Sequence, residues 1–184
     1  MGWIILVIVV LIVIAIISMY NGLVSARVKV DNAWSQIDVQ LQRRFDLIPN
    51  FVETVKGYAA HESETFEKIT QLRTSWANAS TVAEKADLDN QLSTALKTIM
   101  AVSENYPELK ANQNFSELSE ELRNTENKIS FSRQFYNDTV TMYNTKLEVF
   151  PSNIFASVFN FTAEPLFTVE SDEARKNVKV DFNK

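Results

Sequence analysis

The sequence contains no cysteine, and this absence removes several kinds of chemistry. Disulfide bonds, thiolate nucleophiles and cysteine-ligated zinc or iron–sulfur centres are all excluded. The lack of cysteine is compatible with a reducing compartment, but it does not establish where the protein is located.

Turn-forming residues are scarce, with three glycines and four prolines in 184 residues. A β-sandwich or an α/β domain needs turn signals about every 8–12 positions, which this chain cannot supply, whereas long helices need few. Gly2, Gly22 and Gly57 all lie in helical surroundings, so a glycine-rich phosphate-binding loop is excluded as well.

Histidine occurs once, as His61, and this limits both metal binding and nucleophilic catalysis. A di-iron bundle needs a Glu-x-x-His motif on each of two helices, and here Tyr58 stands three residues before the histidine. The run from His61 resembles the start of a zincin motif, but Thr65 occupies the place of the second histidine. Adjacent carboxylates such as Glu120 and Glu121 are typical of a solvated helix surface. We therefore predict no catalytic residue, no metal site and no cofactor.

The charge balance argues against a nucleic-acid partner. The formal net charge is −5, and no basic tract is longer than Arg43-Arg44. A protein that binds nucleic acid needs a dense positive face to displace counterions.

A long apolar run is the clearest positive feature. Residues Trp3 to Tyr20 contain no charge, glycine or proline, and as a helix they cover roughly 27 Å, close to the thickness of a bilayer's hydrocarbon core. We predict a retained single-pass anchor that contacts the lipid bilayer through residues 3–20. The alternative is a signal peptide cleaved near Val24-Ser25-Ala26, although such peptides have a positive start and a shorter apolar run.

The flanking charges indicate an orientation. Arg27 and Lys29 follow the anchor, whereas only the α-amino group precedes it. The positive-inside rule then places the remainder of the chain in the cytoplasm.

The remaining sequence is patterned as amphipathic helices. Val30, Trp34, Ile37, Leu41 and Phe45 form one apolar stripe that continues from the anchor, with Trp34 expected in the core. Because proline disfavours helical backbone in the residue before it, this first helix is predicted to end near residues 44–48. A second helix is predicted from Pro49 to Arg73, with Gly57 explained by a close helix–helix approach.

Two further helices complete the pattern. Thr81-Val82-Ala83-Glu84 matches a capping box and begins a third helix that extends to about Asn105. A fourth, with a heptad seam typical of a coiled coil, begins near Asn114 and ends at Phe150-Pro151. We predict an all-α fold in which the N-terminal transmembrane helix continues into an antiparallel bundle of about four long helices.

Domain limits follow from these elements. The anchor is assigned to residues 1–20, the helical bundle to 21–163 and a polar C-terminal tail to 164–184, in which Val178, Val180 and Phe182 have the spacing of a short strand. The apolar segment Ile154–Phe161 and this alternating segment have no obvious place in a four-helix core. We expect both to contact a neighbouring subunit or to fold back over the end of the bundle.

Polar residues adjoin the apolar seams of the first and fourth helices. They are Asn32, Asp38, Arg44, Asn127, Arg133, Asn137, Asp138 and Asn144. One interpretation is the solvated flank of a bundle. The other is a paired polar network that fixes helix register or subunit contacts. Neither implies catalysis.

Several strings together resemble the LemA family of bacterial membrane proteins. They are NAWSQID from Asn32, RRFDLIPN from Arg43, VKGYA from Val55, YPELKAN from Tyr106, TENKI from Thr125, YND from Tyr136, YN from Tyr143 and FPSNI from Phe150. The resemblance runs from the anchor to about residue 182. It implies a single-pass anchor in a bacterial inner membrane and a helical domain, and it transfers no catalytic residue.

Three functions are compatible with the sequence. The first is a non-enzymatic, membrane-anchored scaffold that self-associates through its helical domain into a homo-oligomer larger than a dimer and organises the membrane or envelope. The second is an adaptor that binds another membrane or envelope protein, whose identity is unknown. The third is an enzyme that uses only carboxylates and amides.

Overall fold

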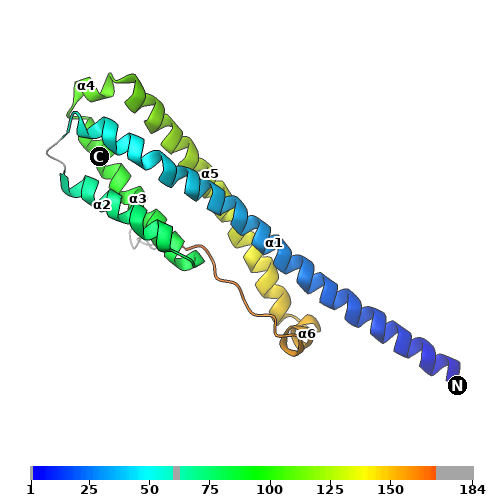
Figure 1. The fold of residues 1–184 in the computed structure, drawn as a ribbon. Coiled ribbons are helices and arrows are strands. Elements are labelled where there is room, and N and C mark those ends of the chain that lie inside the picture. The colour runs from blue at the N-terminus through cyan, green and yellow to red at the C-terminus, as the bar shows by residue number, and fades with distance from the viewer. Residues whose placement is uncertain (1, 60–62, 169–184) are drawn as a thin grey trace, which may run out of the picture.

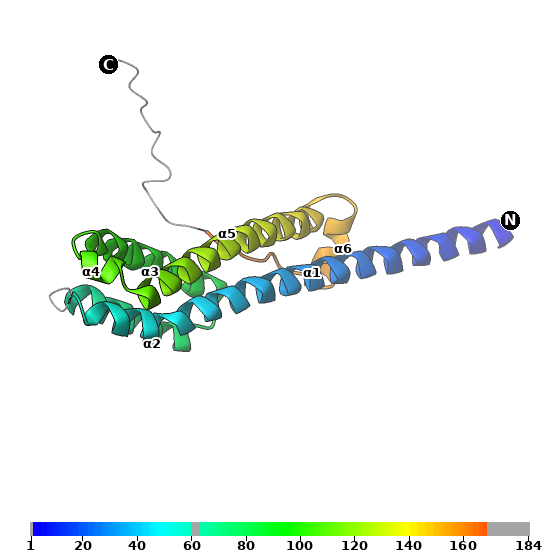
Figure 2. The same cartoon turned by 90° about the horizontal axis from the view of Figure 1, so that it is seen from above.

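The computed structural model describes residues 2–59 and 63–168, and within them every regular element is a helix. Figures 1 and 2 show one very long helix along which the rest of the chain packs. The predicted all-α class, with an N-terminal apolar helix followed by further helices, is confirmed. His61 and the Val178–Phe182 segment lie outside the described residues.

Helix α1 extends without interruption from Gly2 to Lys56. Its first part carries large apolar side chains that are mostly exposed, whereas from Leu23 onward one stripe is buried. Among the described residues, α1 alone is long and apolar enough to cross a membrane. The apolar segment and the first helix of the bundle are therefore one continuous helix, as predicted.

The predicted helix boundary at Pro49 is wrong, because α1 continues through this proline to Lys56. Proline inside a helix removes one hydrogen bond and costs about 3 kcal/mol. The buried stripe keeps its phase across this point, with Phe45 and Ile48 before the proline and Val52 after it. Their burial offsets the lost bond.

The second helix is correspondingly shorter than predicted. Helix α2 comprises Ser63–Asn78, and Gly57 lies in the turn after α1. The close helix approach proposed for this glycine is wrong as well, since an added Cβ would meet only an ordinary contact, 3.6 Å from the Thr54 carbonyl oxygen.

Helix α3 comprises Val82–Ser103 and begins with the predicted capping box. The Glu84 backbone N–H donates to the Thr81 hydroxyl, while the Glu84 carboxylate accepts from the backbone N–H groups of Ser80 and Thr81. These backbone bonds lower the pKa of Glu84. Helices α2 and α3 pack against each other as a hairpin.

The chain then returns along α1. A single-turn helix, α4 (Pro107–Lys110), leads into α5 (Gln113–Glu148), which is capped by Asn112 and packs against α1 over much of its length. Two tyrosines, Tyr136 and Tyr143, are fully buried in the α5 seam. Helices α1 and α5 thus form the central pair, and the α2–α3 hairpin covers the end furthest from the apolar segment (Figure 1).

The last described part of the chain folds back over the opposite end of the bundle. Helix α6 (Ser152–Val158) packs against α1 and α5. It ends in a left-handed Asn160, with φ 55°, and the Phe161 N–H bonds to the Ala156 carbonyl. Residues 160–168, named the strap below, then run from α6 towards the α2–α3 hairpin (Figure 1).

Candidate functional site

The most buried cation in the described residues is Arg44, which is 3% exposed. Its Nη1 donates to Asp89 Oδ1 at 2.7 Å and to Ser93 Oγ at 2.9 Å, both on α3. The Glu126 carboxylate of α5 lies 2.6 Å from the same nitrogen. One side chain of α1 therefore joins α3 and α5 through charge.

Burial dominates the electrostatics of this cluster. Desolvation raises the pKa of Asp89, and the Arg44 guanidinium opposes that rise. Arg44 Nε and Glu126 Oε2 are buried without a well-aligned hydrogen bond among the described residues, so the Glu126 contact is an ion contact rather than a directed hydrogen bond. A buried pair of this kind adds little net stability, because the desolvation of both charges offsets their attraction.

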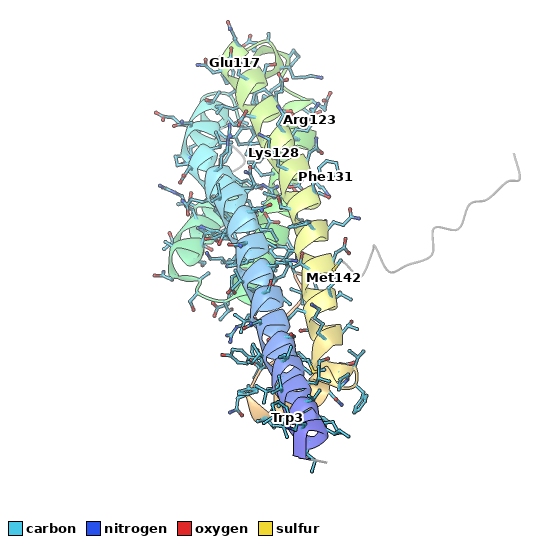
Figure 3. The ribbon with its side chains drawn as sticks, turned by 90° about the vertical axis from the view of Figure 1, so that its right-hand side faces the viewer. Trp3, Glu117, Arg123, Lys128, Phe131 and Met142 are labelled. Carbon is cyan, nitrogen blue, oxygen red and sulfur yellow. The ribbon has the colours of Figure 1, made fainter. Side chains whose placement is uncertain are left out.

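An open groove of about 820 Å³ lies beside Arg44, between α3, α4 and α5. Its lining mixes cations, carboxylates and hydroxyls with a few apolar side chains, and one hydroxyl, Ser119 Oγ, is buried without a partner. Figure 3 shows Arg123, one of its cations, on α5. The lining contains no histidine or cysteine, and no group of three metal-binding side chains occurs in the described part of the chain.

A second polar cluster surrounds Lys85 of α3. Its ammonium pairs with the Asp38 carboxylate of α1 and lies over the rings of Trp34 and Trp76, at 5.7 Å and 5.0 Å from their centroids. The Trp76 ring stacks on Phe45 at 4.3 Å. Trp34 itself is only half-buried, and it packs against the edge of the core rather than in its centre.

A third cluster holds the strap against α5. The Asn144 side chain donates to the Glu164 carbonyl and accepts from the Glu164 N–H, and Asn137 makes the same two bonds to Phe167. The hydroxyls of Tyr136 and Tyr143 donate to strap carbonyls at 2.8 Å and 3.0 Å. Burial raises the pKa of Tyr136 to about 12, so this phenol remains a donor at neutral pH.

These clusters distinguish the two interpretations of the seam polar residues. Arg44, Asp38, Asn137 and Asn144 belong to paired networks between elements. Three of the other predicted residues, Asn32, Asn127 and Asp138, are exposed on helix surfaces. Sequence reasoning missed the strap itself, although the Tyr-Asn pair repeated after seven residues was its visible signal.

The comparisons with known proteins agree with the resemblance found in the sequence. Residues 33–182 match the LemA family. A protein named Protein LemA from Metamycoplasma hominis is 27% identical over 164 residues, which cover 89% of this chain and 73% of that relative. Because the family match spans most of the chain, the chain belongs to the LemA family.

Proposed function

We propose that this LemA-family protein is a non-enzymatic, single-pass scaffold of the bacterial inner membrane that self-associates through its helical domain on the cytoplasmic side. The observation that carries the proposal is the continuity of α1. A helix without a break transmits the position of its exposed apolar segment directly to the bundle, so an anchored chain would hold its domain at a defined angle to the bilayer. An organiser of neighbouring molecules needs such a defined geometry.

Self-association is supported by the outer surface of α5. Phe131, Phe135 and Met142 are 75%, 54% and 67% exposed, and their spacing places them along one side of the helix. Figure 3 labels Phe131 and Met142 on the α5 ribbon. Large apolar side chains exposed along one side of a folded domain are typical of an interaction surface. We name these three residues the α5 patch.

The size of the intact protein in mild detergent tests this proposal. Light scattering coupled to size-exclusion chromatography separates the protein mass from the detergent mass. We expect one homogeneous particle larger than a dimer at every protein concentration in the working range. A monomer at all concentrations would contradict the scaffold.

A monomer would instead favour the second candidate, an adaptor for another membrane or envelope protein. The groove beside Arg44 supports this alternative, because its mixed charges and hydroxyls could recognise a polar segment of a partner. The third candidate is an enzyme that uses only carboxylates and amides. Metal analysis of the purified protein tests whether such a site binds a metal.

A further inference from the structure

The end of the bundle at α6 carries an unusual uncharged surface. No charged residue occurs between Glu148 and Glu164, and the intervening segment includes Phe150, Phe155 and Phe159. Within α6 only Ala156 is fully buried. Large apolar side chains therefore remain outside the core at this end; they are Val149, Phe150, Ile154, Val158 and Phe159. We name these five residues the α6 patch.

The α6 patch lies beside the last turn of the apolar run in α1. The Tyr20 ring contacts the rings of Phe159 and Phe161 edge-on, with centroids 4.9 Å and 5.9 Å apart. Tyr20 is the aromatic residue that ends the run predicted to span the bilayer. Aromatic residues of this kind lie at the level of the lipid headgroups, so the contact places α6 at the same level.

The first charged residue of α1 after that level is Arg27. Arg27 of α1 lies 3.9 Å from the Glu164 carboxylate of the strap, about two helical turns after Tyr20, or roughly 10 Å. Lys146 and Glu148 end α5 just before the patch. The boundary between uncharged and charged surface thus falls at the same level on α1 and on the strap, where Arg27 and Glu164 meet.

We propose that the α6 patch inserts into the interface of the same bilayer that α1 spans, and so forms a second lipid contact. This inference rests on the anchoring role proposed for α1. The argument for lipid is continuity: the patch adjoins the apolar surface of α1, and both surfaces end at the same band of charge. Phe150, 80% exposed at the turn between α5 and α6, is the residue best placed to enter the acyl region.

A second membrane contact has a mechanical consequence. A single helix alone can tilt and rotate in a bilayer, whereas two contacts separated across the bundle restrict both motions. The α1–α5 pair would then stand at a fixed angle and rotation, and its outer surfaces would face neighbouring molecules in a fixed direction.

Because the chain has no cysteine, single introduced cysteines provide unique labelling sites for a test. The full-length variants Phe150→Cys, Val158→Cys, Ile8→Cys and Val39→Cys carry an environment-sensitive fluorophore. They are reconstituted into phosphatidylcholine–phosphatidylglycerol vesicles, with or without a phosphatidylcholine that bears a nitroxide quencher near its headgroup. Ile8 reports the anchor itself, and Val39, exposed on α1 far beyond Tyr20, is the matched control outside the membrane.

We expect the nitroxide lipid to quench the labels at Phe150 and Val158 several-fold more than the label at Val39. This quenching should not change when the protein is diluted with excess lipid. If Ile8 is quenched but Phe150 and Val158 are not, the second contact is wrong and the anchor stands. A blue-shifted, unquenched signal at Val158 that disappears on dilution would assign the patch to a second copy of the chain and overturn the lipid contact. If Ile8 is also unquenched, both the anchor and the second contact fail.

Discussion

The side-chain amide of Asn144 forms two hydrogen bonds with the backbone of one residue, Glu164, at 2.9 Å and 3.0 Å. A side chain on a helix thereby replaces the partner strand that extended backbone normally requires. Asn137, seven residues earlier and two helical turns away, repeats the arrangement on Phe167 at 3.0 Å and 2.8 Å. The strap can follow α5 closely because these two amides satisfy its backbone.

The first prediction tests this pairing. Replacing Asn137 or Asn144 with alanine leaves a backbone N–H and a carbonyl without partners, and each change should lower the free energy of unfolding by about 1–3 kcal/mol. Hydrogen exchange should become faster at the amides of Phe167 and Glu164, respectively. The matched control is Asn127→Ala, an exposed asparagine of the same helix, which should change stability by less than about 0.5 kcal/mol. Equal effects at all three positions would contradict the pairing.

The helical class was predictable because periodicity and scarce turn residues pointed in the same direction. The capping box at Thr81 was also predictable, since the interactions of that motif are local in sequence. The helix end predicted at Pro49 was wrong, because the local penalty of proline received more weight than the apolar stripe that continues from Phe45 to Val55. Tertiary burial prevailed over a local preference.

The polar clusters were only partly predictable. A sequence shows that Arg44 adjoins an apolar seam, but its partners Asp89 and Glu126 are distant in the chain, and no local rule pairs them. The sequence assigns only the second half of the strap, residues 164–168, to a polar tail, because the chain becomes charged beyond Glu164-Pro165. The order of the strap depends instead on side chains of α5, and on Phe167, which is 1% exposed.

The second prediction concerns the buried charge. Arg44→Met should lower stability by about 3–5 kcal/mol near neutral pH, because Asp89 would remain buried without its cation. Adding Asp89→Leu should restore much of that loss. Arg43→Met is the neighbouring control; its exposed ion pair with Glu121 should contribute no more than about 1 kcal/mol. Chemical unfolding of each variant gives these values, and a similar loss for Arg43→Met would refute the special role of Arg44.

The third prediction gives the pH dependence of the Arg44→Met defect. Burial already raises the pKa of Asp89, and loss of the guanidinium should raise it further above the unfolded value of about 3.9. The folded variant then binds a proton more tightly than the unfolded chain. The contribution of Asp89 to the stability of the variant should therefore be greatest at low pH and fall as the pH rises through the folded pKa. The difference from the parent protein should be smaller at about pH 5 than at about pH 8; a larger difference at the acidic end would contradict this assignment.

The fourth prediction concerns Trp34, whose ring centroid lies 5.8 Å from Tyr136 and 6.3 Å from Phe167. Full burial would make Trp34→Ala cost about 3–5 kcal/mol. Because the ring is only half-buried, we expect a loss of about 2–3 kcal/mol, with a smaller loss for Trp34→Phe, which keeps an aromatic contact. A change near zero in thermal or chemical unfolding would show that the ring does not stabilise the strap.

The fifth prediction concerns retention and orientation of the anchor, for which Arg27 and Lys29 provide the signal. In right-side-out spheroplasts the helical domain should resist added protease, and it should be digested once the cells are lysed. Digestion before lysis would reverse the orientation. A mature protein that begins at Arg27 would show that the apolar segment is a cleaved signal peptide.

The proposed self-association can be tested at the α5 patch without disturbing the core. Because Phe131 and Phe135 are exposed, the double change to glutamate should leave the thermal transition nearly unchanged while reducing the particle in detergent to a smaller species. The matched control replaces both residues with leucine, which preserves the apolar surface and should preserve the size.

If the glutamate variant keeps its full size, the α5 patch has no part in association. A chain cut after Thr168, which retains the strap and its buried Phe167, then tests the remaining tail, and loss of the large particle in that chain would assign association to residues 169–184.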